Sequence, residues 1–310
     1  MLLENELVDH RKLLRLVAEE FHGAALGHGE TDTLEFVPLG EDSWSYRCGS
    51  LWISVRRDLD GHFPGAYEAA LLLRAGGKEF VLAPLAGRSG RVVYEVGGLP
   101  VVVFPYVERA ALPSANPPGD SHLAALVRQL REIHRFSTPA DLQAEVPVED
   151  FQFPFEADLD KALQAALDGD VSGGPYSARL TALVTRRWDH LTALRRDAAR
   201  TAERCADLWR GEPPALTHGD PSPANVLFGE DVLILDWGGL MWAPPERDWS
   251  AVSRAFGTAP RGRAELLRFY EVRWTLAEIA EYAARFAGQH TGDADDEAMW
   301  GRLMRYLPAP

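Results

Sequence analysis

The segment 218–225, of sequence HGDPSPAN, and Asp236, eleven positions after Asn225, carry side chains whose types and spacing suit phosphoryl transfer. In that chemistry one carboxylate takes the proton from an attacking hydroxyl, while an amide oxygen and a second carboxylate hold Mg²⁺ against the phosphates of a nucleotide. Magnesium prefers hard oxygen ligands and keeps some of its water. We therefore predict that Asp220 is the catalytic base and that Asn225 and Asp236 are the metal ligands.

A short hairpin is expected to fold Asp236 back beside Asn225. Residues 226–228 and 232–235 are apolar, and the turn-forming residues 229–231 separate them. Each piece alone has an ordinary structural explanation, because Asp-Pro and Ser-Pro dipeptides are common in turns. The order of the pieces, with an apolar strand directly before the last aspartate, favours the catalytic interpretation.

The run from Leu216 to Asn225, followed by LDW at 235–237, resembles the aminoglycoside phosphotransferase and choline kinase family. Members of that family resemble protein kinases in fold. The segment 243–248, of sequence APPERD, is similar to the stretch after the metal aspartate in the spectinomycin phosphotransferase branch. The resemblance implies the same roles for Asp220, Asn225 and Asp236 as their chemistry does.

The resemblance also implies residues that support the catalytic loop. By this resemblance Asp248 is a structural aspartate that braces the loop, and His218 is a supporting residue within it. Trp237 takes the place of the aromatic residue that follows the metal-binding aspartate in kinases.

Composition limits the class of protein. The chain has 310 residues, of which 46% are hydrophobic and 25% charged, as in folded globular proteins. Its net charge of −14 argues against a nucleic-acid partner and suits a cationic substrate. Acidity that serves only solubility is an equally open interpretation. We see no secretory signal and no apolar run of membrane-spanning length, so we expect a cytoplasmic protein with no membrane partner.

The periodicity of apolar residues predicts a β-rich front part and a mainly helical back part, hence an α+β fold. This order fits the protein-kinase-like, two-lobed fold that the resemblance implies, with a small β-rich N-lobe and a larger, mainly helical C-lobe. We place the nucleotide-binding lobe at 1–104, the catalytic and acceptor-binding lobe at 105–310 and the hinge at about 103–108. The predicted strands are 34–39, 44–48, 51–55, 91–96 and 99–104. The predicted helices are 5–21, 66–74, 123–136, 158–167, 180–209 and 264–286. The two cysteines, Cys48 and Cys205, are expected to be buried.

A kinase-like front lobe supplies a loop over the phosphates, a cation on a strand and an acid on a helix that holds the cation. The loop candidate is 40–46, where the hydroxyl of Ser43 and backbone amides can contact a phosphate. The alternative is that this segment is an ordinary β-hairpin. The resemblance makes Glu68 the acid. The expected strand lysine is missing, and Arg56 is our candidate to replace it, since its fork can grip phosphate. The alternative is that Arg56 is only a surface charge.

The resemblance places the adenine against the hinge, at Phe104, Tyr106 and Val107. Backbone groups there can pair with the edge of the base. For the side chains of Phe104 and Tyr106 we favour core packing.

An acceptor site in the helical lobe is also implied by the resemblance, with acidic and aromatic side chains that recognise cationic sugars. Our candidates are Asp158, Trp242, Glu278 and Glu281. A solvated helix face for the acids, and core packing for the aromatic residue, are the structural alternatives.

These residues together predict a Mg²⁺-dependent phosphotransferase that moves the γ-phosphoryl group of ATP or GTP to a hydroxyl of a small polar, possibly cationic molecule. An aminoglycoside-like antibiotic is the leading acceptor, which would make the protein a resistance enzyme. One alternative is a kinase of Ser or Thr in a natural-product peptide. Another is a non-catalytic binding protein with a kinase fold. The choice of ATP or GTP, the acceptor hydroxyl and the oligomeric state stay open.

Overall fold

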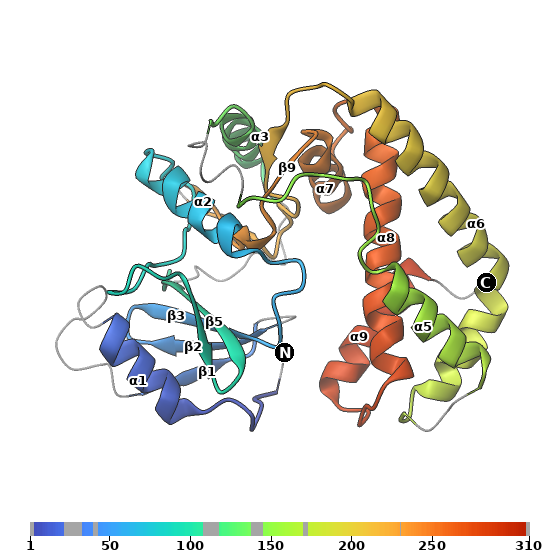
Figure 1. Ribbon diagram of the computed structural model, residues 1–310, viewed down its shortest axis with the longest axis horizontal. Coiled ribbons are helices and arrows are strands. Elements are labelled where there is room, and N and C mark those ends of the chain that lie inside the picture. The colour runs from blue at the N-terminus through green and yellow to red at the C-terminus, as the bar shows by residue number, and fades with distance from the viewer. Residues whose placement is uncertain are drawn as a thin grey trace. The chain divides into compact units, whose positions relative to one another are not determined.

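The computed structural model (Figure 1) describes residues 3–21, 33–39, 43–107, 118–137, 145–169, 173–229 and 231–307. Three parts of the predicted loops and hinge lie outside the described residues, namely 40–42, Glu108 and Glu230. Residues 113–117 of the proline-rich stretch 113–119 lie outside them as well. The chain divides into two compact units, which comprise residues 1–149 with 213–259 (unit 1) and residues 150–212 with 260–310 (unit 2). The two predicted lobes are a different division, because they are assigned by binding role with the boundary between residues 104 and 105. That division stays a prediction.

An antiparallel sheet with strand order β1-β2-β3-β5-β4 forms the first part of unit 1. Its strands are β1 (Glu35–Val37), β2 (Ser43–Cys48), β3 (Leu51–Arg56), β4 (Val93–Val96) and β5 (Leu99–Pro105). The helix α1 (His10–Glu20) buries Leu13 and Val17 in one core with the sheet, and Phe21 follows them. Their four-residue spacing places them on one helix face. The predicted strands are confirmed. The first helix is confirmed as well, but it begins at His10 rather than at residue 5, because the side chain of Asp9 caps its N-terminus.

The β2–β3 hairpin and the helix that follows it position the residues of the predicted nucleotide end. Ser43 lies directly opposite Arg56 in the register of the hairpin. The helix α2 (Pro64–Ala75) confirms the helix predicted at 66–74. It follows His62 and Phe63 and begins with Pro64, at a position where a missing backbone N–H costs little.

The remaining elements of unit 1 carry the motif residues. They are α3 (Asp120–His134), β6 (Ala215–Thr217), β7 (Val226–Phe228), β8 (Val232–Ile234), the 3₁₀ helix η1 (Trp237–Gly239), β9 (Met241–Ala243) and α7 (Glu246–Phe256). Strands β7 and β8 pair antiparallel, which confirms the predicted hairpin. Strands β6 and β9 also pair, with Thr217 opposite Met241. This second pairing places the start of the segment 218–225 beside the chain that follows Asp236.

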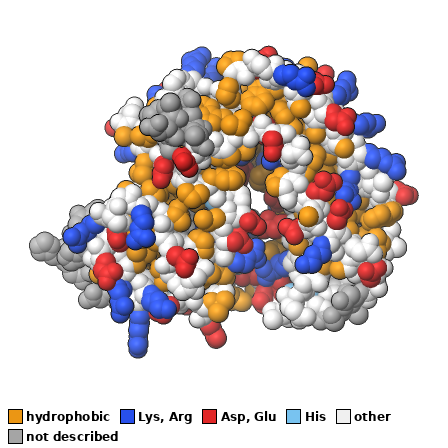
Figure 2. Space-filling view, viewed as in Figure 1, with side chains coloured by type: hydrophobic (Ala, Val, Ile, Leu, Met, Phe, Trp, Pro, Cys, Tyr) orange, Lys and Arg blue, Asp and Glu red, His pale blue; other side chains and the backbone are white. Residues whose placement is uncertain are grey.

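Unit 2 is helical. Its elements are α5 (Glu156–Leu167), α6 (Ser177–Trp209), α8 (Ala264–Ala287) and α9 (Ala294–Tyr306). The first three confirm predicted helices, and they share one apolar core with α9. Cys48 in unit 1 and Cys205 in unit 2 are both buried, as expected. Within the described ranges, no helix is long and apolar enough to cross a membrane. Acidic and basic side chains are interspersed over the face seen in Figure 2.

Candidate active site

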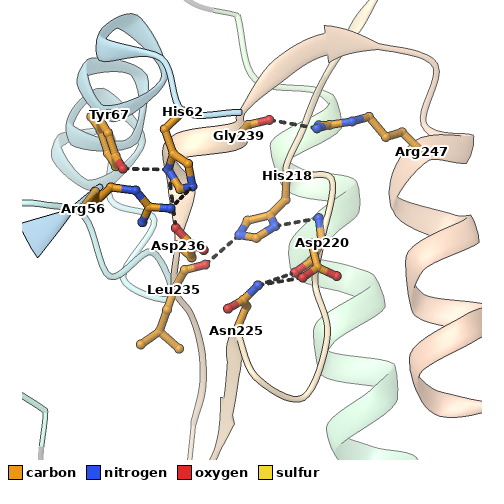
Figure 3. Close-up of polar contacts among 10 residues, drawn as sticks. All are labelled: Arg56, His62, Tyr67, His218, Asp220, Asn225, Leu235, Asp236, Gly239 and Arg247. Atoms are coloured by element: carbon orange, nitrogen blue, oxygen red, sulfur yellow. Dashed lines mark hydrogen bonds and ion pairs between the residues drawn. The ribbon is translucent and has the colours of Figure 1, made fainter. Parts of the chain in front are cut away.

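Residues 218–225 form a tight loop after β6, and backbone hydrogen bonds within the loop stabilise it. Ser222 N donates to Asp220 O at 2.8 Å, and Asn225 N donates to Ser222 O at 2.9 Å. Leu235 N then donates to Asn225 O at 2.8 Å, which ties the loop to the residue before Asp236. The structure therefore brings together the three residues that the motif singles out (Figure 3).

The two carboxylate oxygens of Asp220 have different surroundings. Oδ2 accepts hydrogen bonds from Asn225 Nδ2 at 2.9 Å and from Ser222 Oγ at 3.2 Å. Oδ1 is buried, and among the described residues no hydrogen-bond donor reaches it. The guanidinium of Arg254 lies 3.8 Å from Oδ1. A buried acceptor without a donor is costly, so it calls for a functional explanation.

Burial raises the pKa of Asp220 above its ordinary value. His218, Arg254 and the hydrogen bond from Ser222 act in the opposite direction, and the charge of Asp236 adds to the rise. A carboxylate with a raised pKa is a stronger proton acceptor, which suits a general base.

His218 joins the catalytic loop to the hairpin. Its Nε2 lies 2.7 Å from Leu235 O, and its Nδ1 lies 3.2 Å from the amide nitrogen of Asp220. A carbonyl oxygen only accepts, so Nε2 carries the proton and Nδ1 accepts the amide N–H. The ring also packs edge-on against Trp237, with centroids 4.7 Å apart. These contacts are those of a loop-supporting residue.

Asp248, in the first turn of α7, is completely buried beneath the same loop. Its Oδ1 accepts from Gly219 N at 2.6 Å, and its Oδ2 accepts from His218 N at 3.2 Å and from His134 Nε2 at 2.8 Å. Burial by itself would raise the pKa of Asp248, but the hydrogen bond and charge of His134, with His218 and Gly219, outweigh it and lower the pKa. Asp248 therefore braces the loop as a carboxylate.

The backbone at Gly219 requires a glycine. Its φ is +98°, and an added Cβ would overlap the guanidinium of Arg247. That guanidinium donates to Thr217 Oγ1 at 3.1 Å and to Gly239 O at 2.9 Å. Arg247 thus links the residue before the catalytic loop to the residues after Asp236.

Asp236 follows β8 in a conformation that few non-glycine residues adopt, with φ 59° and ψ 65°. Such backbone strain is typical of functional sites. Its side chain is 40% exposed. The amide oxygen of Asn225 points away from Asp220, because the amide nitrogen donates to Asp220 (Figure 3). A carboxylate and an amide oxygen fit the hard-oxygen preference of Mg²⁺.

The predicted nucleotide contacts start from the β2–β3 hairpin. Ser43 and Arg56 are both buried, so Arg56 is not a surface charge. Arg56 NH2 lies 2.5 Å from His62 Nε2. Glu68 lies on the exposed face of α2, whereas its neighbour Tyr67 is buried. The structure thus shows His62, rather than Glu68, against the guanidinium. No sequence signal identified His62, because it lies in a loop.

The hinge side chains pack against their neighbours, as we favoured. Phe104 meets Tyr67 edge-on at 6.4 Å, and Tyr106 stacks on Trp52 at 6.3 Å. Val107 is half-buried. The pairing of hinge backbone groups with a base stays a prediction.

The acceptor candidates divide between the units. Asp158 and Glu281 are exposed residues of unit 2, where Glu278 accepts from Tyr282 Oη at 2.9 Å. Trp242 belongs to unit 1 and is buried, and its indole N–H has no hydrogen-bond partner in the described part of the chain. A cavity of about 380 Å³ in unit 2 is lined by other residues, including Asp150, Phe153, Glu156 and Glu203. The four acceptor assignments stay predictions.

Comparison with known proteins gives consistent matches. Residues 63–283 match the model described as the Phosphotransferase enzyme family. The chain is 63% identical over 311 residues to Protein StrN of Streptomyces griseus, covering 100% of this chain and 97% of that protein. The spectinomycin phosphotransferase structure with ADP and spectinomycin has a TM-score of 0.70 at 16% identity, covering 98% of this chain and 95% of that one.

A second solved structure is the GDP complex of aminoglycoside 2'-phosphotransferase-IIIa, with a TM-score of 0.55 at 17% identity, covering 98% of this chain and 99% of that one. At these identities the structural matches establish the fold. The kinase-like α+β fold and the resemblance drawn from the motif are confirmed.

Proposed function

We propose that this chain, which belongs to the phosphotransferase enzyme family, is a small-molecule kinase with an alcohol group as acceptor. It moves the γ-phosphoryl group of ATP or GTP to a hydroxyl of a small polar molecule, foremost an aminoglycoside-like one. Membership in an enzyme family argues against the hypothesis of a non-catalytic binding protein.

The observation that carries the proposal is the environment of the Asp220 carboxylate oxygen Oδ1. This oxygen is buried, and no described residue donates a hydrogen bond to it. The hydroxyl of an acceptor supplies the missing donor. Asn225 and Ser222 hold the other carboxylate oxygen, so the orientation of Oδ1 is set before the acceptor arrives.

In the proposed reaction, Asp220 accepts the proton of the acceptor hydroxyl as the hydroxyl oxygen forms a bond to the γ-phosphorus. The bond between the γ-phosphorus and the β–γ bridging oxygen breaks, and the nucleoside diphosphate leaves with that electron pair. Asn225 and Asp236 would hold Mg²⁺, which offsets phosphate charge when bound. His218 and Asp248 keep the loop that carries Asp220 in place.

Two observations support the nucleotide and acceptor classes. One similar structure is described with ADP and spectinomycin, and another with GDP. The net charge of −14 favours the approach of a cationic acceptor. A peptide hydroxyl is the alternative acceptor.

The test is a mass-shift screen with Mg²⁺ and either ATP or GTP. Acceptors are aminoglycosides, spectinomycin, choline and Ser- or Thr-containing peptides. We expect one added phosphoryl group on an aminoglycoside-like compound. Asp220→Asn should lower turnover by roughly 10²- to 10⁴-fold and retain the thermal shift caused by nucleotide. Phosphorylation of peptides alone would refute the acceptor class, and near-normal turnover by the variant would rule out the role of Asp220.

A further inference from the structure

His62 lies between two residues that the proposed function assigns to the nucleotide and the metal. Its Nε2 is 2.5 Å from Arg56 NH2 on β3, and its Nδ1 is 3.9 Å from Asp236 Oδ1. Nδ1 is also 2.8 Å from Tyr67 Oη on α2. Only 9% of the His62 side chain is exposed. The four side chains form one connected group (Figure 3).

The contacts determine which ring nitrogen carries the proton. A guanidinium group has only N–H donors, so Nε2 must accept from Arg56. The proton of the neutral ring is therefore on Nδ1, which donates to Tyr67 Oη. Tyr67 is 1% exposed, so burial holds its hydroxyl in position. In a histidine, the partner of one nitrogen decides the state of the other.

Close packing ties this group to the chain after Asp236. Phe63 N donates to Gly238 O at 2.9 Å. An added Cβ at Gly238 would overlap the His62 ring and the Tyr67 hydroxyl, so only glycine fits there. The segment before α2 therefore lies directly against η1. A displacement of His62 would change the positions of both Arg56 and Asp236.

We propose that His62 is a positioning residue that orients Arg56 and packs against the chain that carries Asp236, in the tautomer that Arg56 selects; this rests on the proposed function, in which Arg56 grips the nucleotide phosphates and Asp236 holds the metal. A carboxylate at position 62 would offset part of the positive charge that attracts phosphate. A neutral imidazole orients the guanidinium and adds no charge of its own.

Three substitutions at His62 separate charge from shape. His62→Gln keeps a neutral acceptor and should stay within a few-fold of the wild-type KM for Mg²⁺-nucleotide. His62→Leu should raise that KM by roughly 10- to 100-fold, the equivalent of one hydrogen bond to a charged group. His62→Glu accepts from Arg56 but adds a negative charge, and should also raise KM. Equal KM values for the Gln and Glu variants would overturn the role of the neutral partner.

Long-range ¹H–¹⁵N NMR of the His62 ring reads the tautomer directly and needs no activity. We expect the Nδ1–H form in the wild type, because Arg56 requires an acceptor at Nε2, and a shift toward the Nε2–H form in Arg56→Met. A wild-type ring in the Nε2–H form, or an unchanged ring in Arg56→Met, would overturn the proposal. Arg47→Met is the matched control and should leave the His62 ring unchanged, since it removes a guanidinium of the same sheet that donates to Gly49 O instead.

The two proposals fail separately. If no acceptor is phosphorylated but the NMR result is as expected, the proposed function fails and the tautomer selection by Arg56 stands. If phosphorylation occurs and the tautomer is wrong, only the role of His62 fails.

Discussion

Replacing Asp248 by Asn should destabilise the fold while hardly changing the shape of the side chain. The carboxylate accepts from His134, His218 N and Gly219 N, and is completely buried. An amide has a single acceptor oxygen. If that oxygen serves His134 and His218 N, the NH₂ group faces the N–H of Gly219, where the present distance is 2.6 Å.

The expected cost follows from these contacts. A hydrogen bond to a charged group contributes about 1.5–3 kcal/mol, and a buried donor left without a partner costs about 1–3 kcal/mol. We therefore expect Asp248→Asn to lose roughly 3 kcal/mol, a large part of the roughly 5–15 kcal/mol that stabilises a typical protein. The displaced Gly219 should also lower kcat, because Asp220 is the next residue.

Urea denaturation of both proteins at a series of pH values measures this loss. The pKa of folded Asp248 lies below the ordinary 3.8. Its contribution is therefore present above that value and is lost as the pH falls through the folded-state pKa. The difference between the proteins should shrink in acid.

Asp120→Asn is the matched control, because Asp120 is an exposed aspartate in the first turn of α3. It should change stability by less than about 0.5 kcal/mol. A loss below about 1 kcal/mol for Asp248→Asn at neutral pH, well under the cost expected for these hydrogen bonds, would refute the reasoning, as would a difference that grows on acidification.

Three further predictions concern the same site. Arg254 lowers the pKa of Asp220, so Arg254→Gln should raise it and move the acidic limb of the kcat–pH profile to higher pH; a limb that stays in place contradicts this. Asn225→Leu removes the amide oxygen and should raise the Mg²⁺ concentration for half-maximal activity by roughly tenfold or more; an unchanged Mg²⁺ dependence counts against the ligand assignment. Arg247→Lys cannot span both Thr217 and Gly239 and should cost about 1–2 kcal/mol in urea denaturation, whereas wild-type stability would show that the link is dispensable.

The sequence by itself was sufficient to predict the catalytic loop and the long helices. Asp220, Asn225 and Asp236 are joined by a tight loop and a short hairpin, so their spacing along the chain largely determines their proximity in space. Helices such as α6 and α8 are long enough for apolar periodicity to identify them. The acceptor assignments, which came from a resemblance, gained no such local support.

Only the tertiary structure decided which distant side chains complete the site. Strands β6 and β9 have three residues each, too few for a periodic pattern, and α7 was not among the predicted helices. His62 and Arg254 reach Asp236 and Asp220 from other elements. Their placement depends on how separate segments pack together, and packing of segments far apart in the chain leaves no spacing that a sequence pattern could show.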